Sequence, residues 1–317
     1  MNKLTISITL ILTTASLSLD MAGAVIGSKT TSQPVLRLSG GLFQSKINSK
    51  GNFLAFTEKN GRNLRILDLK SKDIYLVSKE KVDLSFFWAP NGFRLLFKET
   101  VFKNGELAST IKAYDIKRKA SVVLDRIVGR TGTLSFDPRD FRFYLLHEKG
   151  ILSKRLIYPD ERLSKWQMAQ RTDDGKWLIG ANHITWLSNR GLTMSTVEGD
   201  QSGIQSFDIS PDGSHIVWAS KKGAIFISRK GEKAKVVSEG IDVKWHPAKP
   251  IFIFSKAQKN GTKVVGRDLA IGRLDGSIKV LTATPLAMEN AAVWLPDGRR
   301  LLYSNLDTTD LFLMDFQ

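Results

Sequence analysis

Cysteine is absent from this chain of 317 residues. Its absence excludes a thiol nucleophile, a disulfide framework, an iron–sulfur cluster and any zinc site that needs a thiolate ligand. The sequence also lacks the G-x-S-x-G, H-E-x-x-H and G-x-x-x-x-G-K-[ST] patterns of serine hydrolases, zinc proteases and phosphate-binding loops. Histidine is scarce, with four residues far apart in the chain: His147, His183, His215 and His246. We therefore expect no metal, no cofactor and no catalytic group, and read His215 and His246 as residues of hairpin turns.

Long apolar runs are absent beyond the first 24 residues, so no later segment is expected to span a membrane. At the start, Lys3, the apolar stretch 4–19 and the small residues Ala22-Gly23-Ala24 are typical of a secretory signal peptide cleaved after Ala24. A retained anchor is the alternative, but the stretch is shorter than the roughly 20 residues of a membrane-spanning helix. We predict a signal peptide over 1–24, a linker over 25–33, one domain over 34–317 and a periplasmic location.

A turn pattern recurs along this domain. Proline presets the backbone for a tight turn, Asp or Asn tolerates the next position, and Gly accepts the positive φ that reverses the chain. The residues of the clearest copies are Trp88, Pro90 and Gly92; Pro211, Asp212 and Gly213; Trp245 and Pro247; and Trp294, Pro296, Asp297 and Gly298. Weaker copies lie at 47–56, 136–144 and 170–179, and the seven copies are spaced by about 41 residues on average, the period of a four-stranded propeller blade.

Each turn is followed by a short run of branched and aromatic residues, typical of a strand buried on both faces. A third strand follows in most copies and ends in an acid, at Asp68, Asp115, Asp275 and Asp315, which we expect to cap the next turn. The repeated tryptophans are expected to pack between adjacent blades. Trp166, Trp177 and Trp186 fall outside that register, and their role stays open.

These features predict an all-β fold, a seven-bladed β-propeller of four-stranded antiparallel blades. The last copy stops after its third strand at Gln317, whereas residues 34–39 have the apolar alternation of an unassigned strand. We expect this N-terminal strand to complete the last blade and close the ring, which removes an exposed sheet edge.

The Trp-x-Pro-Asp-Gly hairpins, each followed by an apolar strand and a third strand ending in Asp, resemble the β-propeller repeats of TolB-type periplasmic proteins. The resemblance covers about residues 34–317 and implies a propeller, while it implies little about function. TolB-type proteins carry an α/β domain ahead of the propeller. Only about ten residues separate Ala24 from Pro34 here, so we expect a lone propeller.

Negative charge is in short supply, with 31 Asp+Glu against 47 Lys+Arg and a formal net charge of +16. Basic residues fall in the loops between second and third strands, which share one face of the disc. They are Lys59, Arg62, Lys98, Lys103, Lys149, Lys221, Lys222, Lys256, Lys259 and Lys263. Others fall on the opposite face, so the chain lacks the compact basic stripe of a nucleic-acid-binding protein.

The charge and the missing chemistry predict a non-enzymatic, monomeric binding or scaffold protein that contacts an acidic protein or an anionic envelope polymer. Lys221, Lys222, Lys256, Lys259, Lys103 and Lys149 are the candidate binding residues. The alternative is an enzyme, such as a lyase or lactone hydrolase, with its active site in the central funnel. An enzyme should bring His, Asp or Glu together at the inner first strands, and a scaffold should place apolar and neutral polar residues there.

Overall fold

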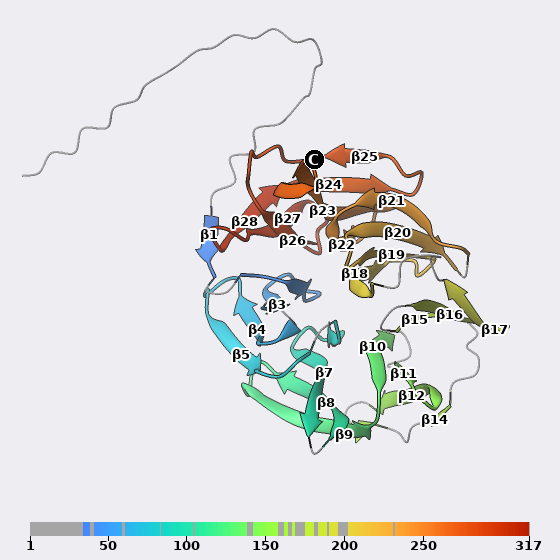
Figure 1. Cartoon of the computed structure of the whole chain (residues 1–317). Coiled ribbons are helices and arrows are strands. Elements are labelled where there is room, and N and C mark those ends of the chain that lie inside the picture. The colour runs from blue at the N-terminus through green and yellow to red at the C-terminus, as the bar shows by residue number, and fades with distance from the viewer. Residues whose placement is uncertain are drawn as a thin grey trace, which may run out of the picture.

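The computed structural model describes residues 34–316, except for short gaps at 39–40, 59–60, 83, 104, 138–141, 158–161, 164–166, 169–174, 181–182, 189, 196–201 and 231. The signal peptide and linker predicted for 1–33 lie outside the described residues. Antiparallel sheets of the described strands stand in a ring, like the blades of a propeller (Figure 1). Within the described part of the chain, no helix is long and apolar enough to cross a lipid bilayer.

The first half of the ring is built in chain order. One blade contains β2 (Gln44–Ile47), β3 (Phe53–Thr57), β4 (Leu64–Asp68) and β5 (Ile74–Ser78). The next contains β6 (Phe86–Trp88), β7 (Arg94–Lys103), β8 (Glu106–Asp115) and β9 (Ala120–Val128). A five-stranded sheet follows with β10 (Thr131–Asp137), β11 (Arg142–His147), β12 (Gly150–Ile157), β13 (Arg162–Leu163) and β14 (Gln167–Met168).

The second half completes the ring. A three-stranded sheet contains β15 (Lys176–Ile179), β16 (Ile184–Ser188) and β17 (Gly191–Ser195). Two blades follow, one of β18 (Ile204–Ile209), β19 (His215–Ser220), β20 (Ala224–Arg229) and β21 (Lys235–Glu239), the other of β22 (Ile241–Trp245), β23 (Ile251–Asn260), β24 (Lys263–Arg273) and β25 (Ile278–Val280). The closing blade contains β26 (Glu289–Trp294), β27 (Arg300–Asn305), β28 (Asp310–Asp315) and β1 (Pro34–Arg37).

The prediction of seven four-stranded blades is wrong. Six sheets have the four or more strands of a blade, while the described residues of the expected fourth copy form the three-stranded sheet β15–β17. The prediction counted one hairpin turn per copy, and a turn marks two strands rather than four.

The predicted closure by an N-terminal strand is confirmed. β1 pairs antiparallel with β28, with Arg37 opposite Asp310, and the two lie side by side in Figure 1. The backbone N–H of Leu38 donates to the carbonyl of Thr309 at 2.8 Å. Leu38 itself is buried in the core of the closing blade, packed in a cluster with Leu42 and Leu311. Strands from both ends of the chain therefore share one blade.

The hydrophobic core lies between adjacent blades. The inner and middle strands are buried, as in β3, in which all five residues are buried, whereas the outer strand β5 alternates between exposed and partly buried residues. Phe53 and Ala55 of β3 share one cluster with Phe86 and Phe97 of the next blade. The faces of neighbouring sheets are thus covered by each other, which removes their apolar side chains from water.

Three tryptophans at the same repeat position join neighbouring blades. Each indole N–H donates to a backbone carbonyl on the inner strand of the preceding blade. The pairs are Trp88 to Lys46 at 2.8 Å, Trp245 to Asp208 at 3.1 Å and Trp294 to Lys244 at 3.4 Å. Buried indole N–H groups need such an acceptor, so the repeat specifies a polar link between blades as well as apolar packing.

The hairpin turns show why the recurrent residues are needed. Gly213 and Gly298 have φ of 70° and 65°, a region that other residues enter with strain. The carboxylate Oδ1 of Asp212 accepts the backbone N–H of Ser214 at 3.0 Å, and that of Asp297 accepts the N–H of Arg299 at 2.8 Å. The acids at the ends of third strands cap turns in the same way, as predicted for Asp68, Asp115 and Asp275.

Candidate functional site

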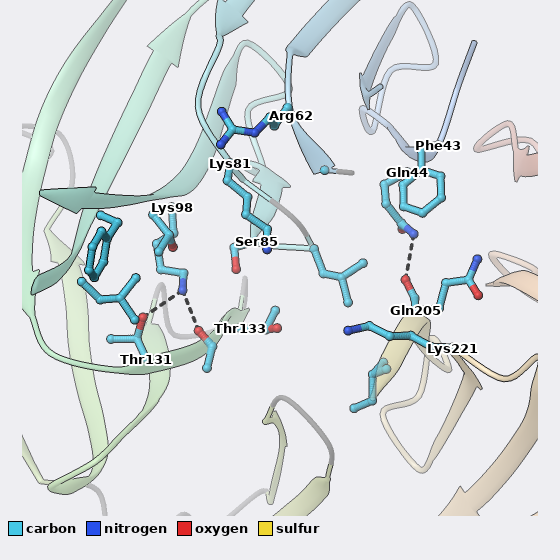
Figure 2. Close-up of a pocket in the computed structure, with 17 residues that line it drawn as sticks. Phe43, Gln44, Arg62, Lys81, Ser85, Lys98, Thr131, Thr133, Gln205 and Lys221 are labelled. Carbon is cyan, nitrogen blue, oxygen red and sulfur yellow. Dashed lines mark hydrogen bonds between the residues drawn. The ribbon is translucent and has the colours of Figure 1, made fainter. Parts of the chain in front are cut away.

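A cavity of about 740 Å³ opens at the face of the ring on which the second strands end and the first strands begin. Residues from four sheets line it, and the β2–β5, β6–β9 and β18–β21 blades contribute most of them. The side chains converge on a common space (Figure 2). This volume lies within the range of pockets that hold small molecules.

The lining is basic. Four cationic side chains reach the cavity, from Arg62, Lys81, Lys98 and Lys221, and no Asp or Glu is found among its described lining residues. The neutral polar lining includes the hydroxyl groups of Ser85, Thr131 and Thr133. Hydroxyl groups and ammonium groups both donate hydrogen bonds to oxyanions. The described lining of the cavity is therefore positively charged and carries several hydrogen-bond donors.

Lys98 is the most firmly placed of the four cations. It lies on β7, is 5% exposed, and its backbone N–H donates to the carbonyl of Ser85 at 2.8 Å. Its Nζ donates to Thr131 Oγ1 at 3.0 Å and to the carbonyl of Gly132 at 2.7 Å. Thr131 Oγ1 is also 2.9 Å from the hydroxyl of Ser109, so a hydrogen-bonded group from two neighbouring sheets fixes the ammonium.

Lys221 enters the cavity from the opposite side, next to Gln205 (Figure 2). Its backbone N–H donates to the carbonyl of Gly203 at 2.9 Å, which ties the turn after β19 to the start of β18. The side-chain amide of Gln44, on β2, donates to the carbonyl of Gln205 at 3.0 Å. This bond joins the inner strands of two blades that are not neighbours in the ring.

A second charged group, Lys46, lies two residues after Gln44 on the same face of β2. Its Nζ is 4.2 Å from the ring centre of Phe87 and 5.9 Å from that of Phe207. Burial, together with the like charge of Lys244, lowers the pKa of Lys46 to about 7, while Asp208 opposes the shift. An amine that titrates near neutrality thus lies on the inner strands beyond the cavity.

The inner strands also carry carboxylates, and those whose side chains are described, on Asp208, Asp242 and Glu289, each accept hydrogen bonds from the framework. Asp208 Oδ2 accepts the backbone N–H of Trp245 at 2.8 Å, and Glu289 accepts bonds from the hydroxyls of Thr282 and Thr284. Asp242 Oδ2 accepts the N–H of Ala291 at 3.3 Å, while its Oδ1 is buried without a hydrogen-bond partner. Burial raises the pKa of Asp242 to about 6. These acids join blades, as Asp208 and Asp242 each bind the next blade in the ring.

The candidate binding lysines are not gathered in one place. Lys221 lines the cavity, and Lys222 follows it in the exposed turn. Lys256 lies within β23, and Lys259 near its end pairs with Glu239. Lys149 is exposed between β11 and β12, and Lys103 ends β7, where its side chain is outside the described part. Sequence reasoning placed Arg62 and Lys98 on this face but missed Lys81, Thr131 and Gln205, which carry no motif.

The histidines do not form a site. His246 is buried, its Nε2 is 2.9 Å from the carbonyl of Gly298, and its ring packs edge-on against Trp294. His215 lies next to a hairpin turn, with Nδ1 2.6 Å from the hydroxyl of Ser214. Over the described part of the chain, no three His, Asp or Glu side chains are grouped so that they could hold a metal ion.

Comparisons with known proteins support the fold. No family model and no curated protein sequence matches the chain. Three solved structures are similar. The β-propeller domain of Myceliophteria thermophila Cps50 (Swd1) has a TM-score of 0.55 and 13% sequence identity, and the match covers 91% of this chain and 99% of that one. U3-55K has a TM-score of 0.59 and 7% identity, with 90% of this chain and 98% of that one covered, and the WD40 repeats of RRP9 have a TM-score of 0.61 and 8% identity, with 92% and 99% covered. At these identities the likeness establishes a β-propeller fold.

Proposed function

We propose that the protein is an exported, non-enzymatic scaffold that binds an acidic segment of a partner protein through the face that bears the cavity. The observation that carries this proposal is the cavity itself, in which Arg62, Lys81, Lys98 and Lys221 face a shared space whose described lining contains no acid. Complementary charge directs association and selects the partner. The similar structures, which include WD40 repeats, are propellers and support the same assignment.

The first experiment asks which face meets the partner. A photoreactive phenylalanine analogue replaces Phe102, which lines the cavity and is 70% exposed. A matched control carries the analogue at Lys70, an exposed turn residue between β4 and β5 on the opposite face. Irradiation of cells should give a protein adduct from position 102 whose crosslinked peptide is acidic. An adduct from position 70 alone would refute docking at the cavity face.

The second experiment tests the charge. Screening shortens the reach of a charge from about 10 Å at 0.1 M salt to about 3 Å at 1 M, so the association rate with the crosslinked partner should fall as salt rises. A variant with four Lys→Gln substitutions on the cavity face should associate more slowly, and a matched variant of the opposite face should not. The cavity-face variant changes Lys221, Lys222, Lys256 and Lys259. The opposite-face variant changes Lys70, Lys117, Lys230 and Lys233. Equal rates for both variants would contradict a role for the cavity face.

Export is part of the proposal, supported by the Lys3, apolar and Ala22-Gly23-Ala24 pattern and by the TolB-type resemblance of the repeats. Mass spectrometry of the protein from a native envelope fraction should find an N-terminus at Val25 or within a few residues of it. An intact Met1 in the membrane fraction would instead indicate a retained anchor.

One observation favours an enzyme as the second candidate. Burial and the like charge of Lys244 lower the pKa of Lys46, on the inner strand β2, to about 7, and an amine that titrates near neutrality can act as a general base. Lactone hydrolysis by the wild-type protein that is lost in Lys46→Met, with unchanged thermal unfolding, would support this candidate. If the wild-type protein hydrolyses none of a panel of lactones, the enzyme candidate is refuted and the scaffold proposal stands.

A further inference from the structure

One wall of the cavity changes character from its depth to its rim. Lys98, Thr100 and Phe102 alternate along β7, so their side chains share one face of the strand, and all three line the cavity. Lys98 is buried, whereas Phe102 near the end of the strand is 70% exposed. Leu107, which pairs with Phe102 across the hairpin, lines the cavity as well. This wall presents an ammonium, then a hydroxyl, then an apolar surface.

The opposite wall carries a separate cation. Lys221 belongs to the turn after β19, in a blade that is not adjacent to the β6–β9 blade of Lys98. Figure 2 shows Lys221 and Lys98 reaching into the cavity from opposite sides, with Lys81 between them. Lys98 and Lys221 therefore belong to two separate walls of the cavity. The cavity, at about 740 Å³, is also far larger than one carboxylate group.

We propose that the occupant is an extended acidic peptide segment with two separated carboxylates and an apolar side chain two residues before the first, because only alternate side chains of an extended chain share one face. One carboxylate lies at Lys98 and Thr131, the second lies at Lys221, and the apolar side chain packs on Phe102 and Leu107 at the rim. This inference rests on the proposed scaffold function and specifies the partner segment that the cavity selects. A lone carboxylate would leave one wall unused, and a purely acidic run would leave the apolar rim uncovered.

The probes are fluorescein-labelled peptides of sequence Leu-Gly-Glu-(Gly)n-Glu with one to five glycines in the spacer, blocked at both ends. Comparison peptides carry Gln in place of the second Glu, or Ser in place of Leu. The protein variants are Lys221→Gln and Phe102→Ser. Their matched controls are Lys222→Gln, in the same exposed turn, and Val128→Ser, which is 66% exposed on β9, and neither residue lines the cavity.

Fluorescence polarisation should find one spacer length that binds best. Loss of the second Glu should weaken that peptide about threefold to tenfold, as expected for a partly exposed ion pair. Lys221→Gln should weaken the two-Glu peptide by the same factor and the one-Glu peptide by less than about twofold, because the two groups form one pair. Phe102→Ser should weaken the Leu peptide and leave the Ser peptide unchanged.

If Lys221→Gln and Lys222→Gln weaken binding of the two-Glu peptide equally, the proposed pairing of the second carboxylate with Lys221 is refuted. Binding would then depend on the overall positive charge rather than on one ion pair. Peptides that fail to bind, while vesicles with anionic lipid bind through Lys221, would replace the peptide with a lipid headgroup. If no probe binds but crosslinks still form at position 102, the peptide model is refuted and the scaffold function survives. If crosslinks at position 102 fail as well, both are refuted.

Discussion

Ring closure can be tested at one buried side chain. Leu38 follows β1, is 1% exposed and packs in a cluster with Leu42, Leu54 and Leu311, residues from both ends of the chain. Leu38→Ala removes apolar contacts from a site that cannot collapse, because strands from the two ends meet there. Such truncations cost about 2–5 kcal/mol.

The expected shift follows from the size of the domain. Unfolding entropy of about 2.1 cal/mol/K per residue gives about 0.6 kcal/mol/K for a domain of this size, so Leu38→Ala should lower the Tm by about 3–8 °C. The control is Arg37→Ala, which removes an ion pair with Asp310 whose Arg side chain is 75% exposed. An exposed pair contributes less than about 1 kcal/mol, or under 2 °C here.

Scanning calorimetry at pH 7 measures both variants against the wild type. Deletion of residues 25–40, which removes β1 and Leu38 together, should lower the Tm more than either substitution. An unchanged Tm for Leu38→Ala, or equal shifts for Leu38→Ala and Arg37→Ala, would refute closure by the N-terminal strand as a source of stability.

Three other predictions concern single side chains. Burial raises the pKa of Asp242 in the folded protein to about 6, above its usual value. The protonated side chain therefore stabilises the fold below about pH 4, and this stabilisation is lost as the pH rises through 6. Above that pH, the buried carboxylate lowers the free energy of unfolding by about 3 kcal/mol. Asp242→Asn, whose side-chain oxygen can still accept the Ala291 N–H, should therefore raise the free energy of unfolding by about 1–3 kcal/mol at pH 8. In urea titrations it should also flatten the pH dependence of stability. An unaltered pH profile would contradict the raised pKa of Asp242. Trp245→Phe keeps most of the packing but leaves the Asp208 carbonyl without the indole donor. It should lower the free energy of unfolding by about 1–3 kcal/mol in the same urea titration. An unchanged free energy of unfolding would show that this hydrogen bond does not stabilise the fold. Lys98→Met should reduce binding of the two-Glu peptide about tenfold while far-ultraviolet circular dichroism stays unchanged, and full binding would exclude Lys98 from the site.

The hairpins were predictable from sequence because their physics is local. Positive φ at Gly213 and the Asp212 carboxylate that accepts the Ser214 N–H depend on residues within one turn. Local preferences therefore identified the propeller repeat, and the unassigned strand at 34–39 identified the closing partner of β28. The number of complete blades is not determined by local backbone preferences. It depends on which outer strands form, and these strands are short and largely exposed, as in β5 and β25, so burial imposes little apolar pattern on them.

The cavity was decided by the tertiary structure alone. Lys98 and Lys221 are 123 positions apart by residue number, and each is an ordinary basic residue of a repeat that has many. Only closure of the ring brings the ends of β7 and β19 to the same space, so that Lys98 and Lys221 line one cavity. The sequence by itself determined the blade, its turns and its excess of positive charge, because those follow from backbone preference and composition. Which cations face one another was decided by blade order around the axis, since their proximity is a property of the closed ring rather than of any segment.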